Sequence, residues 1–210
     1  MKVTSSSLFR WAGFAAMLAG VLFIVMQTIH PADTLASVST GRWAVVHLSG
    51  VAMCLFGLAG ITGIYARQAK ASGGLGLAGY LLFSLFFALT MCFQFAEALI
   101  FPLLTTEAPG LLEGFLALAG GASVGTELGA LATVYSVVGG LYMLGGTLFG
   151  IATFRSGMFP RWAAGLLAAG GLASVLVVSL LPHPLDRLAA APIGVGLAWL
   201  GYSLWTERRE

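Results

Sequence analysis

The chain has 210 residues, of which 59% are hydrophobic and only 9% are charged, and its mean hydropathy is +0.95. Soluble domains carry about 25% charged residues, so this composition excludes a soluble globular protein and indicates an integral membrane protein. The net charge of +2 is too small to indicate nucleic-acid binding. Because a membrane helix takes about 20 residues, the length suffices for about six spans in a single domain, residues 1–210.

The first half of the chain predicts three spans. The first, from Phe9 to Ile29, is longer than the core of a signal peptide, so we expect it to be retained, and His30-Pro31 ends it. The second runs from Arg42 to Tyr65. A tight turn at residues 72–74, Ser-Gly-Gly, then leads into the third span, from Leu75 to Phe101.

The connection from Leu103 to Thr126 contains a helical pattern of its own. Its 24 residues are many for an unstructured loop in a compact protein. Thr105 or Thr106 can cap a short helix, and Gly120-Gly121 can end it. The apolar stripe of this helix would consist of Leu111, Leu112, Phe115, Leu116 and Ala119. About 14 residues are too few to cross a bilayer, so the pattern predicts a short interfacial or re-entrant helix between spans three and four.

The last three spans are predicted from Glu127 to Phe154, from Arg161 to Leu181 and from Leu188 to Trp205. Thr126 is expected to cap span four, with Glu127 in its first turn, where the helix dipole favours a carboxylate. Pro160 suits the first turn of span five. The predicted fold class is therefore all-α, a polytopic transmembrane helical bundle of six spans.

The basic residues predict the orientation of these spans. Eight of them fall on one side, namely Lys2, Arg10, Arg67, Lys70, Arg155, Arg161, Arg208 and Arg209. Only Arg42 and Arg187 fall on the other. Lys and Arg are enriched in cytoplasmic loops, so both termini are expected in the cytoplasm.

Polar residues near the outer end of the spans predict a binding site. Thr90, Gln94 and Glu97 have i, i+4, i+7 spacing and share one face of span three, while His47 lies at similar depth on span two and Glu127 opens span four. A carboxylate exposed to lipid is costly, so Glu97 is expected to face the bundle interior or to reach water at the surface. These residues predict an outward-facing polar pocket for a small molecule or lipid. The alternative is that each group is hydrated separately at the interface.

The same end carries residues that can bind a metal: His30, His47, Glu97 and His183. No two of them have the HxxxH or HxxE spacing that places two ligands on one helix. Haem ligation by His30 and His47 is a further possibility, but the two residues are expected at different depths in the membrane, which argues against it. No cofactor is predicted, and no catalytic residue is assigned, because the chain has neither a reactive cysteine pair nor a histidine in its last span.

The segment from Gly145 to Gly171, GGTLFGIATFRSGMFPRWAAGLLAAGG, has an Arg-Ser-Gly turn followed by Pro-Arg-Trp at the start of the next helix. It resembles a family of uncharacterised bacterial six-helix integral membrane proteins, a domain of unknown function. The resemblance is more diffuse over span one and over Trp43 to Pro102. It implies this fold in a bacterial cytoplasmic (inner) membrane, and it implies no activity.

Three functions remain open at this point. The leading prediction is non-catalytic binding of a small molecule or lipid by a transport-related or accessory protein. The alternatives are a metal-dependent membrane enzyme and a structural subunit of a larger membrane complex. The expected partners are membrane lipid, a small-molecule ligand and another membrane protein or a second copy of the chain.

Overall fold

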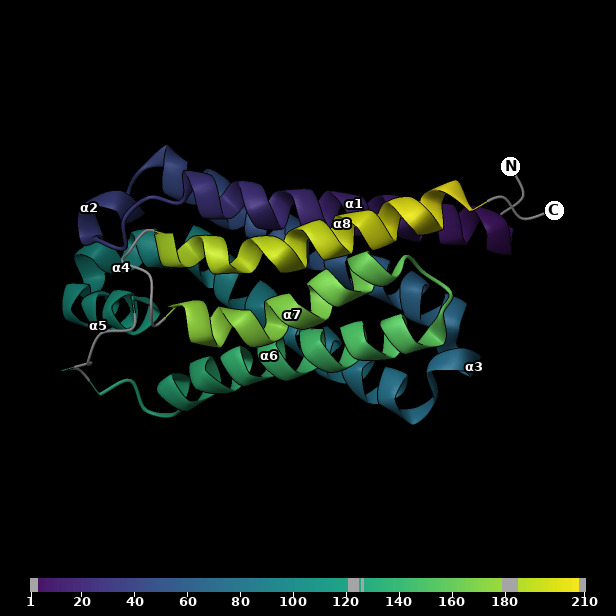
Figure 1. The fold of residues 1–210 in the computed structure, drawn as a ribbon. Helices are drawn as coiled ribbons and strands as arrows, with labels where there is room; N and C mark the ends of the chain where they lie inside the picture. Colours follow the sequence, from purple (N-terminus) through teal and green to yellow (C-terminus); the bar gives the residue numbers. More distant parts are fainter. Residues whose placement is uncertain (1–3, 121–124, 126, 179–184, 208–210) are drawn as a thin grey trace.

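A computed structural model describes residues 4–120, 125, 127–178 and 185–207, without the side chains of 174–178 and 185–186. The described residues form a bundle of helices (Figure 1). These are α1 (Ser5–Ile29), α2 (Leu35–Val38), α3 (Gly41–Leu99), α4 (Phe101–Glu107), α5 (Pro109–Ala119), α6 (Ala130–Ser156), α7 (Arg161–Val178), the 3-10 helix η1 (Leu185–Ala190) and α8 (Ala191–Thr206). The predicted all-α fold is confirmed.

Helix α3 is a hairpin of two helices. A straight helix of its 59 residues would be about 88 Å long, about three times the thickness of a membrane core. Gly73 breaks it with φ 56° and ψ −151°, a conformation that costs glycine less than any other residue. The halves pack together, with the rings of Tyr65 and Tyr80 stacked at 4.6 Å. The predicted turn is confirmed, and the helix continues past Tyr65, the predicted end of span two, as far as this turn, because the following ARQAKA segment contains no helix breaker.

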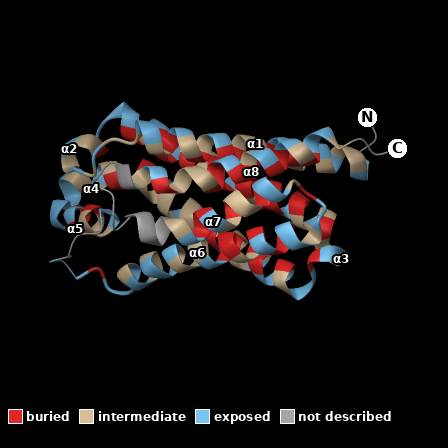
Figure 2. Ribbon diagram, in the orientation of Figure 1, coloured by how far each residue is buried: buried red, intermediate tan, exposed pale blue. Residues whose placement is uncertain are grey.

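Four of the described helices are long and apolar enough to cross a membrane: α1, α3, α6 and the helix from Arg187 to Thr206. Only 39% to 44% of the most apolar window of each is buried. Figure 2 shows the long helices with intermediate and exposed residues, coloured tan and pale blue, between the buried ones. Large apolar side chains such as Val45, Leu85 and Leu144 are exposed there, which fits a surface solvated by lipid rather than by water. The structure thus supports a membrane protein.

Glycines let the long helices approach closely. In α3, Gly79 lies against the backbone of Phe149 in α6, and Gly145 in α6 lies against the backbone of Phe83. Gly150 meets the backbone of Ala168 in α7 in the same way. A side chain at these positions would overlap backbone atoms, so small residues define these helix contacts.

The segment after the α3 hairpin differs from its prediction. It forms two helices rather than one, because Ala108 precedes Pro109 and leaves the helical region with φ −151° and ψ 63°. Thr105 and Thr106 lie inside α4 and donate to the carbonyls of Pro102 and Leu103, so they are not caps. Gly120 ends α5 as predicted.

The predicted apolar stripe of this segment is partly confirmed. Leu112 and Leu116 are buried in a small core that also contains Val38, Trp43 and Phe101. Leu111, in contrast, is 37% exposed. The stripe therefore packs α5 against the start of α3 and against α2.

Two later boundaries also differ. Helix α6 begins at Ala130 after Gly129, whose φ of 56° is not helical, so the prediction that Glu127 lies in the first turn was wrong. The predicted cap Thr126 lies outside the described residues, as do residues 179–184, in which the end of span five was predicted. The last span starts with the 3-10 helix η1, and α8 follows from Ala191.

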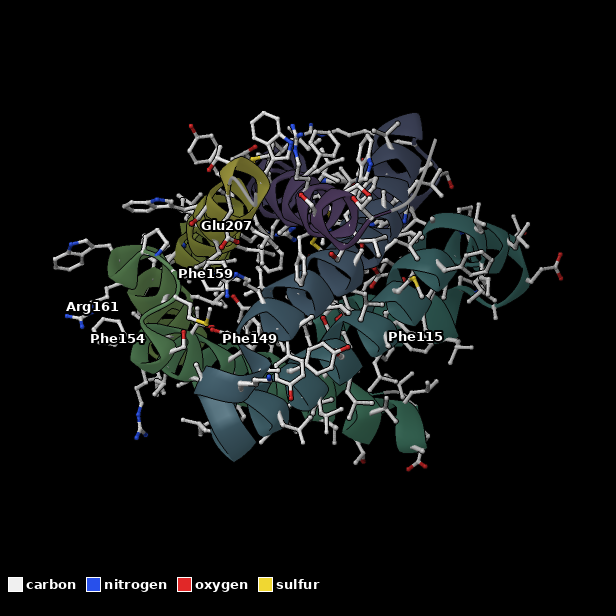
Figure 3. All side chains as sticks on the ribbon, turned by 90° about the vertical axis from the view of Figure 1, so that its right-hand side faces the viewer. Phe115, Phe149, Phe154, Phe159, Arg161 and Glu207 are labelled. Atoms are coloured by element: carbon white, nitrogen blue, oxygen red, sulfur yellow. The ribbon has the colours of Figure 1, made fainter. Side chains whose placement is uncertain are left out.

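The predicted basic side of the bundle is one physical end. The start of α1, the end of α8, the Gly73 turn and the α6–α7 turn lie together at the right of Figure 1, while α2, α4 and α5 lie at the left. Figure 3 looks onto the right-hand end, where Arg161 lies beside the ring of Phe154 at 5.8 Å. We call these the basic end and the α5 end. The α5 end corresponds to the predicted outer side.

Candidate functional site

The polar cluster at the α5 end centres on His47 and Glu97. His47 Nδ1 lies 3.0 Å from Glu97 Oε2 and 3.3 Å from Gln94 Oε1. Gln94 Nε2 in turn donates to Glu97 Oε2 over 2.9 Å. His47 is only 2% exposed and Glu97 13%. Glu97 therefore faces a partner from the other half of α3 rather than lipid.

The α3 hairpin creates this cluster. The reversal at Gly73 places His47 in the first half beside Gln94 and Glu97 in the second, whose i, i+3 spacing puts them on one face. The Gln94 side chain occupies the space that a side chain at position 50 would need, so Gly50 makes room for it. The indole nitrogen of Trp43 donates to the carbonyl oxygen of Glu97 over 2.7 Å and ties the hairpin ends together.

His30, just after α1, adds a second layer to the cluster. Its ring meets that of His47 edge to face, with centroids 5.1 Å apart, and its Nδ1 lies 2.7 Å from the carbonyl oxygen of Pro31. Burial lowers the pKa of His30 to about 4, with a smaller contribution from the positive charge of Arg187, so the ring is neutral at pH 7. Asp33 accepts a hydrogen bond from Arg187 of η1 over 2.6 Å.

The residues proposed for metal binding are only partly brought together. His30, His47 and Glu97 are neighbours, but His183 lies outside the described residues. Among the residues that the structure describes, no group of three or more His, Cys, Asp or Glu side chains is placed to hold a metal. The rings of His30 and His47 contact each other edge to face, which leaves no space for a haem between them.

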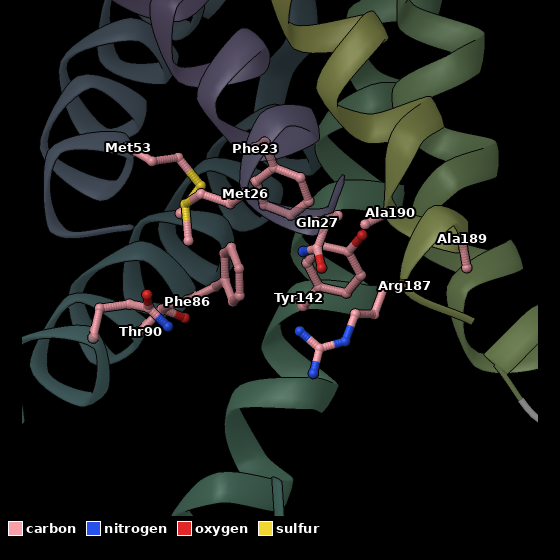
Figure 4. A pocket seen from close by; sticks show the side chains of 11 residues that line it. Phe23, Met26, Gln27, Met53, Phe86, Thr90, Tyr142, Arg187, Ala189 and Ala190 are labelled. Carbon is pink, nitrogen blue, oxygen red and sulfur yellow. The ribbon is translucent and has the colours of Figure 1, made fainter. Parts of the chain in front are cut away.

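A cavity of about 290 Å³ borders the cluster (Figure 4). Its lining comes from α1, α3, α6 and the segment around η1: Phe23, Met26, Gln27, Met53, Phe86, Thr90, Gln94, Tyr142, Arg187, Ala189 and Ala190. Figure 4 shows Thr90 on one side and Gln27 and Arg187 on the other, with the ring of Phe86 between them. The volume is near the lower end of the range for small-molecule sites, about 300–1,000 Å³.

Thr90 Oγ1 and His47 Nε2 are polar atoms of this region that are buried without a hydrogen-bond partner among the described residues. A buried polar atom without a partner costs about 1–3 kcal/mol. The Thr90 hydroxyl belongs to a residue that lines the cavity, so a ligand or water in the cavity can supply the missing bond. His47 Nε2 is the nitrogen remote from Glu97.

The five predicted ligand-binding residues have different positions. Thr90 and Gln94 line the cavity, and His47 and Glu97 adjoin it through their hydrogen bonds with Gln94. Glu127 is exposed, three residues before α6, and is not among the described residues that line the cavity. It is not part of the site as the structure describes it.

Sequence reasoning missed Gln27 and the aromatic wall of the cavity. Gln27 is an amide inside the apolar first span, near the same end as His30, and that isolated polar residue was a usable signal. Phe23, Phe86 and Tyr142 gave no signal, because aromatic residues are ordinary in apolar helices. Phe23 and Tyr142 lie nearly parallel, with centroids 6.1 Å apart.

A second buried polar group at the basic end has a structural role. Gln68 is fully buried and donates to Thr153 Oγ1 over 2.7 Å, while Ser156 donates to Gln68 Oε1 over 3.0 Å. These bonds join α3 to α6. Arg67 nearby holds Glu207 at the end of α8 through three hydrogen bonds.

No protein-family model matches this chain, and searches among curated proteins and among solved structures also return no match. The fold and the site described above therefore carry the functional argument.

Proposed function

We propose that this protein crosses a bacterial cytoplasmic membrane six times and binds a small molecule or lipid in the cavity at its α5 end. The six crossings would be α1, the two halves of α3, α6, α7 and α8, with both termini in the cytoplasm. The α3 hairpin supports two crossings for one continuous helical segment. Helix α7 has 18 residues, about 27 Å, which is close to the membrane thickness.

The cavity carries the binding proposal. Its walls are mostly apolar, and a few polar groups converge on it from three elements: Gln27 from α1, Thr90 and Gln94 from α3, and Arg187 from η1. This combination of an apolar cavity and few orienting polar groups is typical of small-molecule sites. The buried hydroxyl of Thr90, which has no partner among the described residues, supports a ligand that completes the cavity.

The binding test uses three radiolabelled amphiphiles with a ten-carbon chain: 1-decanoylglycerol, decanoate and decyltrimethylammonium. Each is dialysed against the protein in lipid nanodiscs, and empty nanodiscs measure partitioning into lipid. At least one probe should bind saturably to the wild-type protein. Ala190→Phe, which fills the cavity from η1, should weaken that binding at least about tenfold.

Thr90→Val is the finer variant, because it removes the hydroxyl and keeps the shape. It should weaken binding about threefold to tenfold if the ligand bonds to this group. Thr62→Val is the matched control, since Thr62 is exposed and bonds to Tyr80 instead. The binding proposal fails if no probe binds saturably, or if Ala190→Phe leaves binding unchanged.

The orientation is tested by cysteine labelling in a variant in which Cys54 and Cys92 are replaced by alanine. Glu113→Cys on α5 and Lys70→Cys near the Gly73 turn introduce cysteines at exposed positions at opposite ends. In intact cells, an impermeant maleimide should label position 113 and not position 70. The reverse pattern would mean that the proposed orientation is inverted.

A further inference from the structure

The charged residues beside the cavity are already matched in pairs. Arg187 lines the cavity and donates to Asp33 over 2.6 Å, and each side chain of this pair is 15% exposed. Glu97 adjoins the cavity through Gln94 and lies 3.0 Å from His47. Among the described residues, each charged side chain at or beside the cavity wall therefore has an opposite charge or a hydrogen-bonding partner within reach.

The polar groups that remain at the wall are neutral. Gln27, Thr90 and Gln94 offer amide and hydroxyl groups, which donate to or accept from an uncharged headgroup. Thr90 Oγ1 is the clearest of these, because it is buried without a hydrogen-bond partner among the described residues. Apolar residues such as Phe23, Met26 and Phe86 form much of the remaining surface.

We propose that the cavity selects a membrane-soluble molecule with an electrically neutral, hydrogen-bonding headgroup and excludes charged lipids of similar size. This inference rests on the binding function proposed above and names the chemical class of the ligand. An anionic headgroup would have to compete with Asp33 for Arg187, and a cationic one would lie beside the guanidinium. In either case a charge enters a largely apolar site in which the described residues offer no free counter-charge, and this costs more than burying a neutral hydrogen-bonded group.

The same three probes test this selectivity, because they share a chain length and differ in headgroup charge. At about pH 8 decanoate is ionised and decyltrimethylammonium is permanently charged. After subtraction of partitioning into empty nanodiscs, 1-decanoylglycerol should bind at least about tenfold more tightly than either charged probe. Decanoate or decyltrimethylammonium binding as tightly as 1-decanoylglycerol would overturn the inference while leaving the binding function intact.

A charge variant tests the cause of the selectivity. Asp33→Asn removes the counter-charge of Arg187, so decanoate should gain at least about tenfold relative to 1-decanoylglycerol. Arg187→Gln leaves Asp33 without its guanidinium and should produce no such gain. If Asp33→Asn does not fold, as judged by its elution profile, Arg187→Gln alone decides: retained preference for 1-decanoylglycerol over decanoate supports the inference, and stronger binding of decanoate overturns it.

The two proposals fail in different ways. Absence of saturable binding by all three probes would refute the binding function and this inference with it. Binding that is sensitive to Ala190→Phe but indifferent to headgroup charge refutes only the selectivity. An unchanged affinity ratio of decanoate to 1-decanoylglycerol in a folded Asp33→Asn protein would also refute the selectivity, because the Arg187–Asp33 pair would then not set it.

Discussion

The contact between His47 and Glu97 predicts a measurable coupling between the two halves of α3. In the wild-type protein His47 Nδ1 lies 3.0 Å from Glu97 Oε2. Glu97→Gln keeps an oxygen that can accept from this nitrogen but removes the negative charge. Hydrogen bonds to charged groups contribute about 1.5–3 kcal/mol, and neutral ones about 1 kcal/mol. We therefore expect Glu97→Gln to lower the free energy of unfolding by about 1–2 kcal/mol.

His47→Ala should cost more, because it also removes a ring that packs against Trp43 with centroids 4.2 Å apart. A loss of about 2–4 kcal/mol is expected from the cavity and the broken bond together. If the two groups act on each other, the double variant should be about 1–2 kcal/mol more stable than the sum of the single effects predicts.

The assay is reversible unfolding in mixed micelles, followed by circular dichroism, for the wild type, both single variants and the double variant. Glu113→Gln serves as the control, because Glu113 is exposed on α5 and should change stability by less than about 0.5 kcal/mol. Strictly additive effects of the two substitutions would refute the argument, since they would show that Glu97 and His47 are stabilised by separate partners.

Three further predictions concern other parts of the bundle. Burial lowers the pKa of His30 to about 4 from the usual 6.5, so the unfolded chain binds more protons between these pH values, and the stability that neutral His30 provides is present above pH 6.5 and lost as the pH falls toward 4. Across that range the wild type should lose up to about 3 kcal/mol more than His30→Asn in unfolding measurements, and parallel pH profiles would contradict this. Gly150→Ala should cost about 1–3 kcal/mol, because its added carbon would overlap the backbone of α7. Gly146→Ala should be nearly neutral in thermal unfolding, because the tightest contact of its added carbon, at 3.3 Å, is with the end of the Ile193 side chain. Equal effects of the two substitutions would be inconsistent with the described packing. Gln68→Leu should lower the midpoint of thermal unfolding, because Gln68 is fully buried and its substitution removes two hydrogen bonds to α6; an unchanged midpoint would mean that those bonds contribute nothing.

The boundary errors share a physical cause. The pattern of apolar residues locates helices well, but short-range backbone geometry sets where they end. At Ala108 the conflict between a helix and the following proline divides one predicted helix into two. At Gly129 a positive φ delays the start of α6 and leaves Glu127 outside it. In both cases a single residue's conformation decided what the periodicity could not.

The sequence predicted some parts of the candidate site better than others. The i, i+4, i+7 spacing of Thr90, Gln94 and Glu97 defined one face of a helix, which is a local property. Their pairing with His47 was predicted only from the similar depth of these residues along neighbouring spans. The contact between His47 and Glu97 confirms it. The contribution of Arg187 depends on a partner that is 154 residues away in the chain, Asp33. Such contacts have no periodic signature.

The sequence alone determined that this is an all-helical protein with apolar helices long enough for a membrane, because composition and helical periodicity are properties of neighbouring residues. It also determined that the few polar residues within those helices deserved scrutiny, because burying them in an apolar segment is costly. Only the tertiary structure decided which of them meet, where the cavity lies and which charges are already matched. Those features arise from side chains that distant segments bring together, and they depend on how the helices pack rather than on the order of the residues along any one of them.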